Sequence, residues 1–296
     1  MKLLTIFTPT YNRAYCLHQC YESLLRQTNQ DFIWLVIDDG STDNTESLVQ
    51  SWINENIIAI QYHYQENQGM HGGHNAAYQL AETELNVCID SDDFMPDTAV
   101  ADIVEFWGNV SNKNDLAGII GLDAFKDGKI IGEKFPKHLK ESNLEDIHNK
   151  YKINGDKKLV LRTDVIKKYK PYPIFKEERF VPLGILYLHI DKDYKLAVLN
   201  KVLCIVEYMP DGSSMNIVKQ YYRHPRGFQY ERMEYMKYSN YTKVKFRNAI
   251  HYINSSLLLK DWRLFKKTPE LLLTVLAIPF GVLLYFYTLY FNKIKK

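Results

Sequence analysis

The sequence contains few cysteines, the residues that form disulfides and supply the thiolate ligands of zinc sites. Among 296 residues there are four cysteines, Cys16, Cys20, Cys88 and Cys204, and their spacings match neither a zinc ribbon nor a Cys-x-x-Cys redox pair. We therefore interpret them as packing residues. The N-terminal apolar run before Thr8 is too short for a secretion signal, so we expect the main part of the chain to remain in the cytoplasm.

The net charge is only +2, but it is unevenly distributed. Residues 1–214 contain 22 Lys or Arg against 31 Asp or Glu, whereas residues 215–267 contain 12 against 3. A basic rear part indicates an anionic partner, either a membrane surface or nucleic acid. No recognised nucleic-acid motif is present, and a basic, Tyr-rich segment directly before an apolar tail fits attraction to anionic lipid more simply.

The tail contains 21 residues without a charge, from Leu271 to Phe291. This is about the length that spans the hydrocarbon core of a bilayer. Pro279 interrupts the run and three tyrosines crowd its end, which fits interfacial insertion as well as a span. The alternative is a buried pair of amphipathic helices, broken at Pro279. We expect a membrane-associated segment over residues 268–296 and leave its topology open.

Short apolar runs alternate with helical periodicity over the first 100 residues. Each run ends in a polar turn, and residues with helical spacing, such as Leu17, Tyr21 and Leu24, lie between the runs. This alternation predicts an α/β fold with a doubly wound, mostly parallel sheet. The predicted strands are residues 3–8, 32–37, 57–64, 87–89 and 195–208, with helices around 17–24, 75–81 and 220–267 and a hairpin over 116–134.

Polar clusters follow three of the predicted strands, at the edge of a parallel sheet where ligands bind. The sharpest is Asp90-Ser91-Asp92-Asp93, whose alternate carboxylates can point into one crevice. Mg²⁺ or Mn²⁺ is often held by one or two carboxylates while substrate phosphates supply other ligands, so Asp90 and Asp92 are candidate metal ligands. An isolated Asp-x-Asp more often caps a helix or solvates a loop, but two further clusters accompany this one.

The second cluster begins with Asp38 and Asp39, which open a Gly-Ser-Thr-Asp turn after the second strand. An aspartate there can accept hydrogen bonds from a base or ribose, and the turn itself caps the next helix. The third cluster follows the first strand. It comprises Thr8, Pro9, Thr10, Tyr11, Asn12 and Arg13, of which Tyr11 could stack on a base and Arg13 could approach phosphate.

Together the three clusters resemble the signature of family 2 glycosyltransferases in order and spacing. The resemblance is close over roughly the first 100 residues and looser as far as Ser214. It implies a GT-A fold, a UDP-sugar or similar donor, Mg²⁺ or Mn²⁺, and inversion at the anomeric carbon. It also implies that Asp38 or Asp39 meets the nucleobase, that Asp90, with Ser91, lies by the ribose and metal, and that Asp92 ligates the metal at the diphosphate.

The segment from Glu66 to Asn75 resembles the donor loop of this family. Its glycines permit close approach of the backbone to a ligand, so Gly72 and His74 are candidate donor-binding residues. The arginine that usually starts the following helix is absent, and His74 and Asn75 stand nearby instead. We do not expect a zinc site at His71 and His74, since no further Cys or His at ligand spacing supports it.

Glycosyl transfer also needs a general base that takes the proton from the acceptor hydroxyl. The segment from Phe175 to Leu183 resembles the family region that supplies this base, but Leu183 stands where the usual acid is expected. We predict Glu178 or Glu177 as the base. The alternatives are that Asp191 folds back to take this role, that acceptor chemistry is arranged differently, or that the two glutamates belong to a solvated charged loop.

The sequence therefore predicts an inverting, metal-dependent glycosyltransferase that moves a sugar from a nucleotide donor to a lipid-linked or cell-surface glycan acceptor, at the cytoplasmic face of the cell membrane. The predicted domains are a GT-A domain over 1–214, a basic helical extension over 215–267 and the membrane-associated segment over 268–296. One alternative is a catalytically weak nucleotide-sugar-binding scaffold. Another is a sugar-1-phosphate nucleotidyltransferase, which residues 8–13 disfavour because they do not form a basic, glycine-rich loop.

Overall fold

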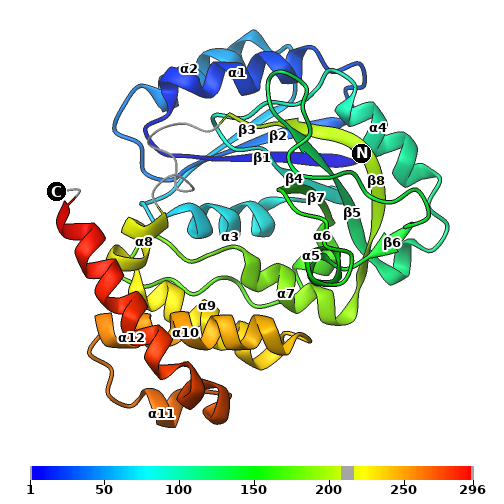
Figure 1. Cartoon of the computed structure of the whole chain (residues 1–296). Helices are drawn as coiled ribbons and strands as arrows, with labels where there is room; N and C mark the ends of the chain where they lie inside the picture. The colour runs from blue at the N-terminus through cyan, green and yellow to red at the C-terminus, as the bar shows by residue number, and fades with distance from the viewer. Residues whose placement is uncertain (1, 208–216, 295–296) are drawn as a thin grey trace. The chain divides into compact units, whose positions relative to one another are not determined.

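The computed structural model describes residues 2–207 and 217–294. The chain divides into two compact units. Unit 1 consists of Met1–Lys170 and Ile190–Glu207, and unit 2 of Pro171–His189 and Tyr208–Lys296. The sheet lies in unit 1 and the C-terminal helices lie in unit 2 (Figure 1). The domain boundary predicted at residue 214 falls outside the described residues.

Unit 1 is built on one eight-stranded sheet with the order β3-β2-β1-β4-β7-β5-β8-β6. The first four strands along the chain are parallel to one another, and β5 is parallel to β8. β7 runs antiparallel to both β4 and β5, and β6 runs antiparallel to β8. The predicted mostly parallel α/β fold is confirmed. The strands are β1 (Leu4–Thr10), β2 (Phe32–Asp38), β3 (Ile60–Tyr64), β4 (Leu85–Cys88), β5 (Leu116–Ala124), β6 (Glu141–Ser142), β7 (Lys157–Arg162) and β8 (Lys195–Ile205).

Helices cover both faces of the sheet because alternate strand residues point to opposite sides. Leu4 and Ile6 of β1 belong to a core that includes Leu17, Trp52 and Trp107, contributed by α1 (Ala14–Leu25), α2 (Thr45–Glu55) and α4 (Ala99–Gly108). The next β1 residue, Phe7, packs instead against α3 (Met70–Leu80), on the other face (Figure 1). Both faces of β1 and β2 are therefore buried.

The predicted start of the third helix is wrong. The prediction began this helix at Asn75, but α3 begins at Met70, so Gly72 and Gly73 lie in its first turn. Glycine has low helix propensity, which obscured the helix in the sequence. The small residues are needed for packing: a Cβ added at Gly73 would lie 3.0 Å from the Pro9 Cβ.

The predicted hairpin over residues 116–134 is partly correct. Its first arm is β5, and the turn at Asp127 and Gly128 is present, with Gly128 at φ +83°. Among the described residues, the returning arm joins β5 through the single bridge between Ala124 and Ile130. The main partners of β5 are distant in sequence, β7 and β8, so β5 is a central strand of the sheet.

Unit 2 contains the basic helices that the sequence predicted over residues 220–267. They pack around a small apolar core that includes Met236, Tyr252, Leu264 and Ala277. The tail is one continuous helix through Pro279, so the alternative of two helices broken at that residue is not observed. The helices are α8 (Ile217–Arg223), α9 (Pro225–Tyr238), α10 (Thr242–Leu258), α11 (Leu264–Lys267) and α12 (Leu271–Ile294). Within the described part of the chain, α12 is the one helix whose length and composition would allow it to cross a membrane.

Candidate functional site

The carboxyl ends of β2, β1 and β4 lie side by side at one edge of the sheet, because these strands are neighbours and run parallel. The register pairs Thr10 with Asp38 and Phe7 with Cys88. One of the three polar clusters follows each strand. The structure therefore brings all three clusters to one edge, which is where ligands bind in open α/β sheets.

Asn12 and Asp38 hold the loops after β1 and β2 together. The Asn12 Oδ1 accepts a hydrogen bond from the Thr42 N–H at 2.7 Å, and the Asn12 N–H donates to the Ser41 hydroxyl at 2.9 Å. Asp38 is buried and accepts from the Ser41 N–H at 2.7 Å and from the Tyr62 hydroxyl at 2.7 Å. Asn12 has φ +53°, a left-handed conformation that asparagine adopts more readily than most residues.

Asp39 fixes the segment that precedes α3. One carboxylate oxygen accepts from the Gln65 side chain at 2.6 Å and from the Gln68 N–H at 2.9 Å, and the other accepts from the Gly69 N–H at 2.7 Å. Asp39 is itself buried. A carboxylate with two oxygens can accept further hydrogen bonds, so this bracing of the loop is compatible with a contact to a nucleobase.

Gly72 and His74 lie inside α3 rather than in a loop. The His74 ring is buried, its Nδ1 pairs with the Met70 carbonyl at 3.0 Å, and it packs edge-on against Phe7 with ring centroids 5.2 Å apart. Burial lowers the pKa of His74, while the nearby Asp90 opposes this effect. His74 is therefore a neutral, packed ring near pH 7.

Along the acidic segment after β4, half-buried and buried residues alternate. Asp90 and Asp92 are half-buried, whereas Ser91 and Asp93 are buried. Asp93 points into unit 1, where it accepts from the Glu207 N–H at 3.0 Å. Burial raises the pKa of Asp93 to about 7, and the neighbouring Asp90 adds to this effect. Asp93 thus anchors the segment, and the two remaining aspartates keep access to solvent.

Lys158 of β7 is the cation that balances these acids. Its side chain is only 13% exposed, and its Nζ lies 4.0 Å from Asp123 Oδ1. Burial works against the charge of Lys158, but the acids around it, Asp123 foremost and then Asp93 and Asp90, hold its pKa well above its ordinary value. The sequence analysis missed this cluster. Its one visible signal was Asp123, an acid within the apolar run of β5.

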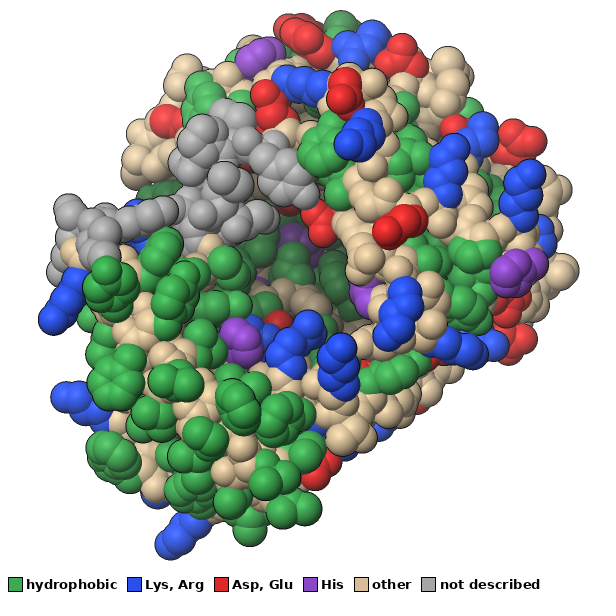
Figure 2. All heavy atoms as spheres, in the orientation of Figure 1, with side chains coloured by type: hydrophobic (Ala, Val, Ile, Leu, Met, Phe, Trp, Pro, Cys, Tyr) green, Lys and Arg blue, Asp and Glu red, His purple; other side chains and the backbone are tan. Residues whose placement is uncertain are grey.

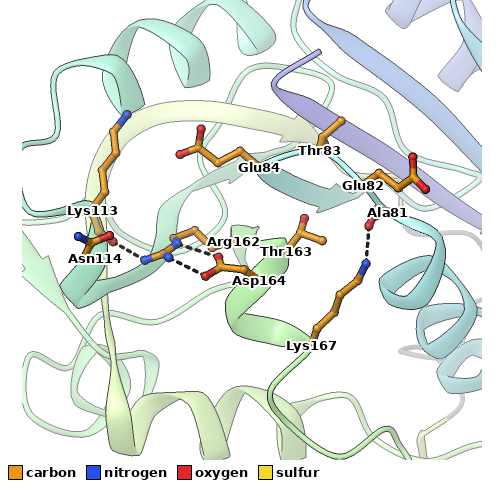
Figure 3. Close-up of a pocket in the computed structure, with 10 residues that line it drawn as sticks. All are labelled: Ala81, Glu82, Thr83, Glu84, Lys113, Asn114, Arg162, Thr163, Asp164 and Lys167. Atoms are coloured by element: carbon orange, nitrogen blue, oxygen red, sulfur yellow. Dashed lines mark hydrogen bonds and ion pairs between the residues drawn. The ribbon is translucent and has the colours of Figure 1, made fainter. Parts of the chain in front are cut away.

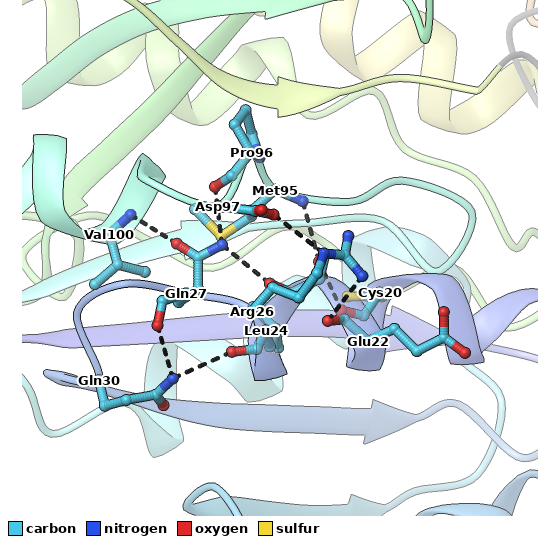
Figure 4. A network of polar contacts seen from close by, with 11 residues as sticks. Cys20, Glu22, Leu24, Arg26, Gln27, Gln30, Met95, Pro96, Asp97 and Val100 are labelled. Carbon is cyan, nitrogen blue, oxygen red and sulfur yellow. Dashed lines mark hydrogen bonds and ion pairs between the residues drawn. The ribbon is translucent and has the colours of Figure 1, made fainter.

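A polar network binds the residues that follow the acidic segment to Arg26 and Gln27, directly after α1 (Figure 4). The Gln27 side chain donates to the Pro96 carbonyl at 2.8 Å and accepts from the Val100 N–H at 3.0 Å. Arg26 pairs with Asp97 at 3.1 Å. Residues 94–100 are therefore fixed from outside the sheet, which limits the movement of Asp90 and Asp92.

Asp90 and Asp92 have the donor chemistry that Mg²⁺ or Mn²⁺ requires. Both carboxylates are reachable from solvent at the ligand-binding edge, and a hard cation prefers such oxygens. Among the described residues, no group of three or more His, Cys, Asp or Glu side chains is placed to hold a metal. The two aspartates therefore fit a cation that takes its other ligands from a bound phosphate and from water.

The cluster after β1 divides into buried and exposed residues. The Thr8 hydroxyl is buried and accepts from the Trp34 indole N–H at 3.0 Å. Thr10 is also buried, and Pro9 is half-buried. Tyr11 is exposed at the site edge, and the half-buried Arg13 donates to the Tyr15 hydroxyl. Of the predicted donor contacts in this cluster, Tyr11 is thus the most accessible, whereas Thr8 has a packing role.

The candidate base Glu178 lies in unit 2 and binds the start of α9. Its carboxylate oxygens accept from the Arg226 N–H and the Gly227 N–H, each at 2.9 Å. This geometry satisfies free N–H groups of the helix and places negative charge at the positive end of its dipole. Burial raises the pKa of Glu178, while the two backbone donors oppose this effect. Glu177, next to it, is exposed.

Asp191, the alternative base, has a comparable structural role in unit 1. Its carboxylate accepts from the Leu144 N–H at 3.0 Å and from the Glu145 N–H at 2.7 Å, at the start of α5 (Leu144–Asn149). Burial raises the pKa of Asp191 to about 7, although these two donors favour its ionised form. Asp191 therefore caps α5.

A pocket of about 510 Å³ lies at the opposite end of β4 from the acidic segment (Figure 3). Its cations already have partners in the protein. Arg162 pairs with Asp164 at 2.7 Å, and Lys167 donates to the Ala81 carbonyl at 2.7 Å. This pocket is separate from the three clusters.

Comparisons with known proteins agree with this geometry. Residues 5–128 match the profile of "Glycosyl transferase family 2". The chain also matches the UDP-Glc:alpha-D-GlcNAc-diphosphoundecaprenol beta-1,3-glucosyltransferase WfaP of Escherichia coli, with 29% identity over 106 residues. This match covers 36% of this chain and 41% of that protein. Matches to three other curated glycosyltransferases span 22–35% of the length of those proteins.

Two solved structures share the fold of nearly the whole chain. Staphylococcus aureus TarS 1-349 in complex with UDP-GlcNAc matches with a TM-score of 0.62 and 18% identity, over 96% of this chain and 82% of that one. The mannosyltransferase PcManGT of Pyrobaculum calidifontis, in complex with GDP-Man and Mn²⁺, matches with a TM-score of 0.55 and 15% identity, over 97% and 86%. Both likenesses show that the fold is of the GT-A type.

Replacing Lys158 with methionine is expected to lower the free energy of unfolding by about 3 kcal/mol, because Asp123 and Asp93 would remain buried without their cation. Chemical denaturation of the full chain measures this loss. The control is the double variant Lys158→Met/Asp123→Leu, which removes both partners and should recover much of the stability. A single variant as stable as the wild type would contradict the charge balance.

The pKa of Asp191 predicts a specific pH dependence of stability. Its folded-state value of about 7 lies above its unfolded value of about 3.9, so the folded chain binds the proton more tightly and loses stability as pH rises from about 4 to 7, by up to roughly 4 kcal/mol. Asp191→Asn should remove this contribution. Melting temperatures of both proteins across this range measure it, and a constant difference between them would refute the assignment.

Proposed function

We propose that the chain transfers a sugar from a nucleotide donor to an acceptor hydroxyl, because residues 5–128 match the profile of glycosyl transferase family 2. The observation that supports this most strongly is the shared edge of β2, β1 and β4. There, the solvent-accessible Asp90 and Asp92 follow one strand, and the braced loops of Asp39 and Asn12 follow the other two.

We propose a UDP-sugar as the donor. A fold neighbour, TarS, is known in complex with UDP-GlcNAc, and the arrangement of this chain suits the same class of ligand. The nucleoside would lie over the ends of β1 and β2, with Tyr11 available to stack and Asp38 and Asp39 holding the loops that receive the base. The diphosphate would lie toward Asp90 and Asp92 at the end of β4.

The proposed cofactor is Mg²⁺ or Mn²⁺, held by Asp90 and Asp92. When bound, such a cation neutralises the charge that develops on the departing nucleoside diphosphate. The protein's own contribution is to hold the two carboxylates at a fixed separation. Asp93 and the Gln27 network anchor the segment that carries them, and Lys158 balances the nearby negative charge.

The reaction is proposed to invert the anomeric carbon. The acceptor oxygen attacks this carbon as its bond to the diphosphate oxygen breaks, and the acceptor proton passes to a general base. We retain Glu177 and Glu178 as the proposed bases. The Glu178 carboxylate already binds two backbone N–H groups of α9, whereas the Glu177 carboxylate is exposed, which favours Glu177 of the two.

The proposed acceptor is a lipid-linked or cell-surface glycan, met at the cytoplasmic face of the cell membrane. The relative WfaP is named for a diphosphoundecaprenol acceptor. The apolar helix α12 would keep this chain close to such a lipid. Assembly of a cell-surface polysaccharide, such as a capsule or a teichoic acid, is the corresponding process.

One observation favours a second candidate function, a nucleotide-sugar-binding scaffold without turnover. Leu183 occupies the position where the family resemblance places the acid, and its carbonyl accepts from the Tyr172 hydroxyl at 2.8 Å in unit 2. A leucine cannot accept the acceptor proton. Donor binding would persist in such a protein, while transfer would not occur.

Calorimetric titration of the detergent-purified chain with UDP, with Mn²⁺ present or chelated, tests the donor site. Binding is expected to require the metal and to weaken at least about tenfold in Asp92→Ala, since loss of even an indirect metal contact costs about that much. Asp115→Ala is the matched control, because Asp115 is an exposed aspartate just before β5, outside both the proposed ligands and the network that holds residues 94–100. Absence of nucleotide binding under all conditions would reject the proposal.

Separate Glu177→Gln and Glu178→Gln variants test the base. Loss of the base should lower kcat by about 10²–10⁴-fold and leave UDP affinity unchanged. Glu178→Gln should also lower stability by about 1 kcal/mol, since it weakens the cap of α9. Sugar transfer and thermal melting measure the two effects. If neither variant loses kcat while the wild type turns over, the base lies elsewhere; a wild type that binds donor without turnover is the scaffold.

A further inference from the structure

Helix α12 has two different faces along its length. Its buried stripe is made of small residues, Thr274, Ala277, Gly281 and Thr288. Each threonine hydroxyl donates to the carbonyl four residues earlier, of residue 270 or 284, at 2.8 Å. The opposite face is apolar and exposed: Leu272 is 72% and Leu283 is 68% accessible. We call this exposed set the apolar face; it comprises Leu272, Leu276, Leu283, Phe286 and Tyr290.

The buried stripe packs closely on α10. A Cβ added at Gly281 would lie 2.6 Å from the Ile253 Cβ and 2.9 Å from the Ile250 carbonyl oxygen. At the start of α12, Glu270 pairs with Lys245 of α10 at 2.7 Å. The two helices are thus in contact from about the beginning of α12 to its middle. Small residues at such a contact let the backbones approach, so α12 is part of the folded unit 2.

This contact argues against α12 as a helix that crosses the bilayer. Arg247 and His251 of α10 lie between the contact points at Lys245 and Ile253, alongside the first half of α12. If α12 spanned the membrane in this arrangement, the exposed Arg247 would enter the hydrocarbon, which costs several kcal/mol. Separating the two helices would instead expose the core around Tyr252.

The surroundings of the apolar face are basic and aromatic. Over residues 260–294, the two acids, Asp261 and Glu270, each pair with a lysine. The cations Lys260, Arg263 and Lys266 are exposed, as are Trp262 and Phe265 nearby. Figure 2 shows apolar side chains gathered at the lower left of the molecule, where Figure 1 places α10, α11 and α12. The cations are suited to contact anionic lipid headgroups, and the apolar side chains are suited to contact the acyl chains.

We propose that unit 2 binds an anionic bilayer surface with α12 lying in the plane of the membrane. The apolar face enters one leaflet, α10 covers the protein side of the helix, and the cations of residues 260–267 contact lipid phosphates. The chain does not cross the membrane at α12. This mode of attachment does not depend on nucleotide binding or transfer.

Flotation with vesicles tests the surface. The full chain, freed of detergent, is expected to bind vesicles of phosphatidylcholine mixed with phosphatidylglycerol, more weakly at high salt and more weakly with phosphatidylcholine alone. Leu276→Glu/Leu283→Glu should bind at least about tenfold more weakly. The matched control is Ile57→Glu/Leu80→Glu, which places the same charges at exposed apolar residues of unit 1 and should bind as wild type. Equal binding by all three proteins would overturn the proposal.

Chemical labelling distinguishes a helix in the plane from one that spans. Lys266→Cys and Lys293→Cys place a thiol before and near the end of α12, and the native thiols, three buried and one half-buried, provide the background. In sealed membrane vesicles, an impermeant maleimide should label both variants from the same side. Labelling from opposite sides would show a spanning helix and overturn the proposal.

Two further results separate this inference from its alternatives. Self-association that buries α12, without flotation, would identify a second copy of the chain as the partner and overturn the membrane assignment. Asp92→Ala should float as the wild type does, even where it no longer binds UDP. A wild-type chain that floats without binding nucleotide would reject the proposed function and leave the membrane surface intact.

Discussion

Three carboxylates gather at the carboxyl ends of β4 and β5, and the buried Lys158 of β7 balances their charge. Asp123 and Asp93 are buried, and Asp90 contributes to the same field. Without Lys158 their mutual repulsion and desolvation would oppose folding of the sheet. This cation is present because β7 inserts between β4 and β5 and carries it to the carboxyl end of β4. The accessible carboxylates of Asp90 and Asp92 therefore depend on Lys158, which balances the charge of the buried acids beneath them.

Local sequence patterns predicted the elements of unit 1 that are determined by residues close to them in the sequence. Alternating apolar runs and turn residues identify β1, β2 and β4, and parallel topology then places their polar ends at one edge. The position of β7 could not be predicted in this way, since it pairs antiparallel with strands far away in sequence. The start of α3 was missed because Gly72 and Gly73 are poor helix formers whose small size is required by Pro9 and Gln68, a tertiary cause.

The candidate site shows the same division. Residue type and spacing indicated that Asp38, Asp39, Asp90 and Asp92 belong to one constellation, but not what each carboxylate binds. Asp39 holds residues 65–69, and Glu178 holds the start of α9, which is 48 residues further along the chain. Such partners are fixed by the fold, so a sequence pattern can identify an acid without distinguishing a catalytic group from a cap.

The sheet order has a consequence for recombining this protein with its relatives. The matched family segment ends at residue 128, within the chain that leads away from β5. A fragment cut there would retain β5 but lose both neighbours of that strand, β7 and β8, and would leave β4 with an open edge. The smallest interchangeable module of unit 1 therefore extends through β8. A chimaera that exchanges the donor-binding half must carry residues 157–162 and 195–205 together with the first 128, because they complete the same sheet.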